Sequence, residues 1–98
     1  MTMYNPPHPG EFIQQVYLDE LNLNARTVAK KLGVHPSTFG RLLKGDTNVS
    51  AEMALRLSKT LGRSPQSWLA MQDNFSLSQV SHTVDLSEVQ PIDTLAHA

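Results

Sequence analysis

The hydrophobic residues of this chain fall into five short blocks with the three-to-four-residue spacing of α-helices. We predict helices over residues 9–21, 25–32, 36–44, 51–61 and 65–75. The first is indicated by positions that recur at helical spacing: Ile13, Val16, Tyr17, Glu20 and Leu21. The pattern therefore predicts an all-α fold of five helices.

Residues that favour helix ends flank these blocks. Asn24 and Ser50 are good N-caps, and Pro36 and Pro65 suit the first helical position. Each of three blocks is followed by a glycine that can close a helix: Gly33, Gly45 and Gly62. A proline-rich arm at residues 5–10 precedes the first helix, and we expect its prolines to keep it extended.

The second and third helices form a helix-turn-helix pattern. Their expected buried faces are Val28, Ala29 and Leu32 on one helix and Phe39, Leu42 and Leu43 on the other. The turn between them is Gly33-Val34-His35. In this motif the second helix lies in the major groove of DNA, with its N-terminal residues at the base edges.

The outward side of the helix at 36–44 is therefore the candidate recognition surface. Arg41 can form two hydrogen bonds with a guanine, hydroxyl groups can bind bases or phosphates, and Gly40 either permits close approach or is neutral. We also expect free amides at the start of the helix at 25–32 to bind a phosphate. The candidate DNA-binding residues are Arg26, Thr27, His35, Pro36, Ser37, Thr38, Gly40, Arg41, Lys44 and Asn48.

The charge distribution agrees with this surface. All eight Lys and Arg residues lie between positions 24 and 63, together with only two acidic residues, so this stretch carries +6. The remaining seven acidic residues flank it without a base, which explains the net charge of −1. A cationic block of this density is typical of a surface that binds a polyanion. For Lys30, Lys31, Arg56, Lys59 and Arg63 individually, we expect a solvated or helix-end role.

The length predicts one small domain at residues 1–75, containing the helix-turn-helix, and a tail at 76–98. The tail lacks bases, is rich in Ser, Thr and Asp, and permits a short strand near residues 83–89 that a partner would order. No apolar run is long enough to span a membrane, residues 1–9 do not resemble a signal peptide, and the absence of cysteine suits the cytoplasm.

Catalytic and metal sites are not indicated. There is no cysteine, GxSxG, P-loop, HExxH or paired-carboxylate motif, so we expect neither an enzyme nor a cofactor. The histidines (His8, His35, His82 and His97) show no metal-ligand spacing. The helix at 65–75 carries more apolar surface than one face can bury, so we expect a dimer contact there through Trp68, Met71, Gln72 and Phe75.

Four segments together resemble a HigA-type antitoxin of the lambda-repressor-like, or XRE, class. These segments are residues 5–13 (NPPHPGEFI), 32–45 (LGVHPSTFGRLLKG), 50–62 (SAEMALRLSKTLG) and 67–69 (SWL). The chain departs from the family pattern at Gly40, inside the recognition helix, and after Phe75, where the family often continues as a charged helix. The resemblance covers about residues 5–75 and implies a five-helix DNA-binding domain.

The resemblance also implies a homodimer, located in the cytoplasm at the nucleoid, that represses its own toxin–antitoxin operon. It further implies neutralisation of a RelE-like, mRNA-cleaving toxin of the HigB type. Two alternatives remain open from the residues themselves. One is a stand-alone phage-type repressor. The other is a pure toxin inhibitor with acidic flanks that bind a basic ribonuclease and a helix-turn-helix that no longer binds DNA.

Overall fold

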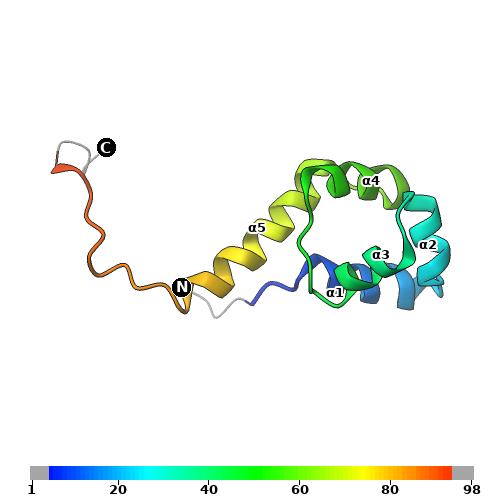
Figure 1. The fold of residues 1–98 in the computed structure, drawn as a ribbon, viewed down its shortest axis with the longest axis horizontal. Coiled ribbons are helices and arrows are strands. Elements are labelled where there is room, and N and C mark those ends of the chain that lie inside the picture. The colour runs from blue at the N-terminus through cyan, green and yellow to red at the C-terminus, as the bar shows by residue number, and fades with distance from the viewer. Residues whose placement is uncertain (1–4, 94–98) are drawn as a thin grey trace.

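Helices form the body of the protein in the computed structural model, which describes residues 5–93 (Figure 1). They are α1 (Pro9–Ile13), the π-helix η1 (Gln14–Asp19), α2 (Ala25–Leu32), α3 (Pro36–Leu43), α4 (Ala51–Leu61) and α5 (Pro65–Ser81). The all-α prediction is confirmed. Residues 1–4 and 94–98, which include His97, lie outside the described residues.

The predicted caps begin and end the helices. The Asn24 side chain accepts from two amides of α2, and the Ser50 hydroxyl accepts from the amide of Met53 at 3.1 Å. Gly33 ends α2 with a φ of 77°, a conformation that costs glycine little. Pro36 and Pro65 occupy the first helical positions of α3 and α5, as their fixed φ favours.

The first predicted helix contains a π-helical segment that its hydrophobic pattern does not reveal. The wider turns of η1 move the following residues around the helix axis, so that Leu18 is buried while Val16 and Leu21 are 42% and 59% exposed. Helical spacing at Val16 and Leu21 therefore does not place these two side chains in the core. Asn22, with a φ of 56°, follows the last helical turn.

The core lies where the five helices meet. α1 packs against α3 and α5, α2 packs against α3 and α4, and α4 packs against α5. Trp68 is fully buried, and its indole N–H donates to the Gly62 carbonyl at 2.9 Å. The other buried hydrophobic residues are Ile13, Leu18, Val28, Ala29, Leu32, Phe39, Leu42, Val49, Ala54 and Leu57.

The backbone of α1 approaches the end of α3 so closely that only glycine fits at position 10. A Cβ atom on Gly10 would overlap the carbonyl oxygen of Leu42 and lie 2.9 Å from the Cα atom of Leu43. This close approach holds α3 at its C-terminal end, so the N-terminal arm and the helix-turn-helix are parts of one packing unit.

The last helix extends beyond the position where the sequence composition changes. α5 continues past Phe75 to Ser81 and leads away from the body, with residues 82–93 as an extended tail (Figure 1). The strand permitted near 83–89 does not form, because the tail has no neighbouring strand within the described residues and turns where the Val89 amide donates to the Leu86 carbonyl at 3.0 Å. None of the described helices is both long and apolar enough to cross a membrane.

Candidate nucleic-acid interface

The third helix is anchored on one side and open on the other. Phe39 and Leu42 are 0% and 1% exposed, so they fix the rotation of α3 about its axis. On the opposite side Ser37, Arg41 and Lys44 are exposed. Pro36, Thr38 and Gly40 are partly exposed along the same helix, and no atom outside the nearby turns of that helix lies within 4 Å of the position that a Cβ atom on Gly40 would occupy.

His35 organises the exposed tip of α3. Its Nδ1 atom accepts from the amide of Ser37 at 3.1 Å and lies 2.8 Å from the Ser37 hydroxyl. The imidazole therefore acts as the N-cap of the helix. Its exposed ring and the Ser37 hydroxyl form one small polar unit at the end that the helix-turn-helix motif directs toward base edges.

The start of α2 differs from the prediction in one respect. The Asn24 side chain accepts from the amides of Arg26 and Thr27 at 2.8 and 3.2 Å, so these amides are not free to bind a phosphate. Asn24 is the N-cap of α2, so the interaction that begins the helix also uses the amides that a phosphate would need. The Arg26 and Thr27 side chains remain exposed.

A basic groove lies between α2 and the turn that leads into α3. It has a volume of about 810 Å³ and is lined by Arg26, Thr27, Lys30, Lys31, Val34 and Pro36. A solvated or helix-end role was expected for Lys30 and Lys31, but both line this groove beside three of the candidate residues. An open groove lined by three cations beside a recognition helix suits the path of a phosphate backbone.

Gln72 was expected in a dimer contact, but its side chain is used inside the subunit. It is 4% exposed, its carbonyl accepts from the Val49 amide at 2.8 Å, and its amide donates to the Asn48 side chain at 3.2 Å. Gln72 therefore holds the loop that follows α3. Its hydrogen bond to Asn48 also positions that exposed candidate residue. Trp68 is 0% exposed, so a dimer contact through Trp68 or Gln72 is not supported. Met71 and Phe75 are partly buried and retain some surface.

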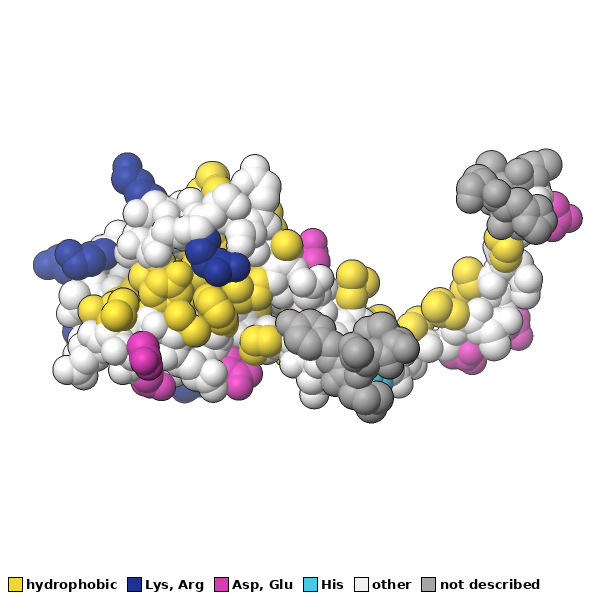
Figure 2. Space-filling view, turned by 180° about the vertical axis from the view of Figure 1, so that it is seen from behind, with side chains coloured by type: hydrophobic (Ala, Val, Ile, Leu, Met, Phe, Trp, Pro, Cys, Tyr) yellow, Lys and Arg dark blue, Asp and Glu magenta, His cyan; other side chains and the backbone are white. Residues whose placement is uncertain are grey.

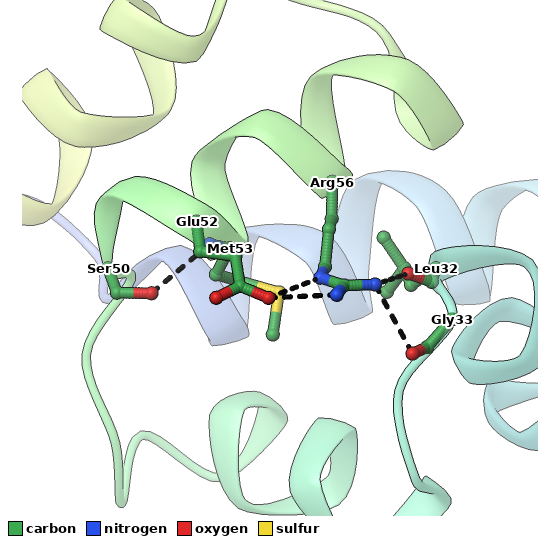
Figure 3. A network of polar contacts seen from close by, with 6 residues as sticks. All are labelled: Leu32, Gly33, Ser50, Glu52, Met53 and Arg56. Carbon is green, nitrogen blue, oxygen red and sulfur yellow. Dashed lines mark hydrogen bonds and ion pairs between the residues drawn. The ribbon is translucent and has the colours of Figure 1, made fainter.

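Arg56 on α4 was expected to have a solvated or helix-end role of its own helix, but it bonds to residues of another element (Figure 3). Its guanidinium donates to the carbonyls of Leu32 and Gly33 at 2.9 and 3.2 Å, at the end of α2 and the start of the turn. The same group forms an ion pair with Glu52 at 2.8 Å. These bonds fasten the turn of the helix-turn-helix to α4 and satisfy carbonyls that a helix end leaves free.

Most cations of the basic block are available to a ligand. The pair of Arg56 with Glu52 is the one ion pair within residues 5–93. Most of the Lys and Arg side chains visible in Figure 2 lie at the end of the body opposite the tail, while acidic side chains follow its lower edge and the tail. The described tail is therefore acidic, and most of the visible cations lie at the opposite end of the molecule.

His8 connects the N-terminal arm to the loop after α3. Its Nδ1 atom accepts from the Gly10 amide at 2.8 Å, and its ring packs edge-on against Phe75 with centroids 5.0 Å apart. Nε2 is buried without a hydrogen-bond partner among the described residues. Burial lowers the pKa of His8. The Thr47 backbone and the Asn48 side chain oppose this shift, although neither forms a hydrogen bond with Nε2.

Comparison with known proteins gives consistent relatives. A helix-turn-helix family matches residues 14–68. The HTH-type transcriptional regulator YddM of Escherichia coli K12 is 44% identical over 94 residues, which cover 96% of this chain and 99% of that protein. The antitoxin HigA-1 of Vibrio cholerae is 29% identical over 85 residues, which cover 87% of this chain and 71% of that protein.

Solved structures agree with these relatives. The antitoxin GraA superposes with a TM-score of 0.83 and 34% identity, over 91% of this chain and 99% of that chain. GraA in complex with its operator superposes with a TM-score of 0.70 and 32% identity, over 87% and 94% of the two chains. Together with the anchored α2–α3 pair and its open basic surface, these matches show that the chain belongs to the helix-turn-helix family of DNA-binding regulators, in the lambda-repressor-like, or XRE, class.

Proposed function

We propose that this protein is the antitoxin of a toxin–antitoxin module and a dimeric, sequence-specific repressor of its own operon. The observation that carries the proposal is the exposed side of α3, where Ser37, Arg41 and Lys44 face solvent on a helix fixed by buried Phe39 and Leu42. In this arrangement Arg41 and Ser37 read base edges, while Lys44 and the basic groove at α2 bind the phosphate backbone. Such a protein acts on the nucleoid in the cytoplasm.

The dimer places two recognition helices on one operator. Because one short helix reads only a few base pairs, specific binding needs two half-sites. Leu77 and Val80, three residues apart on the outward side of α5, are 68% and 53% exposed. We assign the subunit contact to these two side chains, together with the exposed parts of Met71 and Phe75.

Operator binding is tested by fluorescence anisotropy with a duplex from the region upstream of the gene and a scrambled duplex. Replacing Arg41 by Ala is expected to lower the ratio of the two affinities by about 5- to 100-fold, because a two-bond guanine contact supplies ~1–3 kcal/mol of discrimination. Arg63→Gln removes the same charge from an exposed residue outside the recognition surface and should leave the ratio unchanged. A ratio near one for the unmodified protein would reject the repressor function.

The toxin-neutralising role is supported by the similarity to HigA-1 and GraA, which are named antitoxins. Its test is co-expression with the product of the adjacent reading frame, with cell growth and intact mRNA as readouts. We expect this chain to restore growth, and we expect the Arg41→Ala variant to restore it equally well. Operator binding without any rescue would favour a stand-alone repressor, and rescue without operator binding would favour a pure inhibitor.

A further inference from the structure

The tail that follows α5 exposes apolar side chains between acidic ones. Val84, Leu86, Val89 and Ile92 are 45%, 61%, 66% and 67% exposed. The tail also carries Asp85, Glu88 and Asp93, and no Lys or Arg follows Arg63. We call residues 82–93 the C-terminal arm. All of its residues are exposed, so it offers apolar contacts and negative charge that the body of its own subunit does not use.

A groove between α2 and α4 has the complementary character. It has a volume of about 490 Å³ and is lined by Lys31, Leu32, Leu55, Arg56, Lys59 and Thr60. Leu55 in this groove is 61% exposed. Lys31 and Lys59 form no ion pair within the described residues. An exposed apolar side chain in the same groove as two cations without ion pairs suits a segment that carries leucine and valine together with carboxylates.

The arm and the groove of one subunit lie far apart. The arm continues from α5 at one end of the longest axis, and α2 lies at the other end (Figure 1). The molecule extends over 54 Å along this axis. Because α5 is a continuous helix of 17 residues that carries the arm away from the body, the arm does not meet its own groove. A second copy brings the two surfaces together.

We propose that, in a two-fold dimer, the C-terminal arm of each subunit crosses to its partner and lies in the partner's groove between α2 and α4. Leu86 and Val89 then cover Leu55, and Asp85 and Glu88 face Lys31 and Lys59. The proposal rests on the homodimer assigned above and adds where the arms go. Two-fold symmetry makes both contacts equivalent and closes the assembly, whereas a one-way contact would continue into a filament.

The dimensions allow this exchange. Asp85 and Glu88 follow the end of α5 by four and seven residues, a reach of at most about 24 Å for an extended chain. This length is close to the two shorter extents of the molecule, 23 and 22 Å, so these side chains can reach across the width of a partner body that lies beside α5. The groove lies between α2 and α4, whereas α3 packs on α1 and α2, so an occupied groove leaves the outward side of α3 open to DNA. Of the residues that line the basic groove beside α3, the arm contacts only Lys31.

The test measures the dimer dissociation constant of the full-length chain by sedimentation velocity at about 0.05 M salt, where exposed charges are weakly screened. Asp85 and Glu88 are reversed in one variant (D85K/E88K), and Lys31 and Lys59 are reversed in another (K31E/K59E). Each variant is expected to raise the dissociation constant about tenfold or more, because each pair of attractions becomes repulsive. D19K/E20K changes the charge as much as the arm variant and should not change the constant; circular dichroism checks that all variants fold.

Mixing the two variants distinguishes an exchange between subunits from other arrangements. In a heterodimer every reversed arm meets a reversed groove, so a mixture is expected to associate within about threefold of the unmodified chain. A chain carrying all four changes is expected to do the same. If the chain with all four changes associates like the unmodified chain and the mixture does not, the arm docks on its own subunit and the proposal is wrong.

The result also separates this inference from the proposed function. If the unmodified chain dimerises and both charge variants leave the dissociation constant unchanged, the arm exchange is refuted while the homodimer stands. If the unmodified chain stays monomeric up to about 100 times the concentration that saturates its operator, both are refuted, since even weak association would then be visible by mass action.

Discussion

At the scale of single residues, two glycines in the helical body meet opposite surroundings. Gly10 lies against the backbone at the end of α3, where a Cβ atom would overlap Leu42. Gly40 lies on the outward side of α3, where no atom outside the nearby turns of its own helix is within 4 Å of such a Cβ atom. The same added methyl group therefore tests packing at one position and ligand approach at the other.

We expect Gly10→Ala to lower the free energy of unfolding by ~1–3 kcal/mol or more, because backbone atoms must move to admit the methyl group. Gly40→Ala should raise it by up to ~1 kcal/mol, since alanine favours the helix. Urea unfolding of both variants checks this. If Gly40→Ala also weakens operator binding although the protein is more stable, Gly40 serves close approach to DNA; unchanged binding would mean that the position is neutral.

His8 gives the protein a pH dependence with a defined sign. Burial lowers its folded-state pKa below the ordinary 6.5, so the unfolded chain takes up the proton first as the pH falls. The stabilisation is complete above the unfolded pKa and is lost as the pH falls through the folded pKa. We expect the unmodified protein to lose more stability between about pH 7.5 and 5.5 than His8→Asn, which can still cap α1. Equal losses in urea unfolding would contradict this assignment.

At the scale of helices, the residues next to each end explain what the sequence predicts well. Asn24, Ser50 and Pro65 act within a few positions of the helices they begin, so local pattern is sufficient to place α2, α4 and α5. Recognition of the α2–α3 pair follows from the same local signals. Local signals do not reveal the π-helical segment at 14–19, because its residue types are also those of an ordinary α-helix and its packing, as of Tyr17 against Trp68, involves residues far away in the sequence.

In the candidate site, too, some features follow from the local sequence and others depend on contacts with distant residues. The exposed side of α3 follows from its buried side, so Ser37, Arg41 and Lys44 could be found from spacing alone. The roles of Gln72 and Arg56 could not, because each side chain bonds to backbone more than 20 positions away in the sequence. A polar residue on an apolar helix gives no sign of whether it meets solvent, a partner or a distant loop.

Arg56→Met tests the connection between α4 and the helix-turn-helix turn. Loss of the donors to the Leu32 and Gly33 carbonyls is expected to lower the free energy of unfolding by ~1–2 kcal/mol, since both acceptors can still reach water in part. Lys59→Met, on the same helix, should change stability by less than ~0.5 kcal/mol. Similar urea midpoints for the two variants would show that the bonds of Arg56 contribute little.

At the scale of the whole molecule, the recognition surface lies at one end of an elongated shape and the exposed part of α5 lies toward the other. A dimer through α5 therefore sets a fixed distance between two α3 helices. We expect operator affinity to fall sharply when about 5 base pairs are inserted between the half-sites, and to recover in part with about 10, which restores the helical phase of ~10–10.5 base pairs.

Anisotropy titrations of the lengthened duplexes check this prediction, with the insertion placed outside the operator as the control. A dimer with rigidly held α3 helices gives an alternating response to spacing. A smooth decline with length would instead describe two subunits that bind DNA independently.

The contact of Gln72 with the loop after α3 has a mechanical consequence. α5 reaches the Val49 backbone and the Asn48 side chain through one amide group. A partner that shifts α5, whether a second copy or another protein, would therefore also move the loop that follows α3. We therefore expect operator affinity and the binding of a partner at α5 to influence each other.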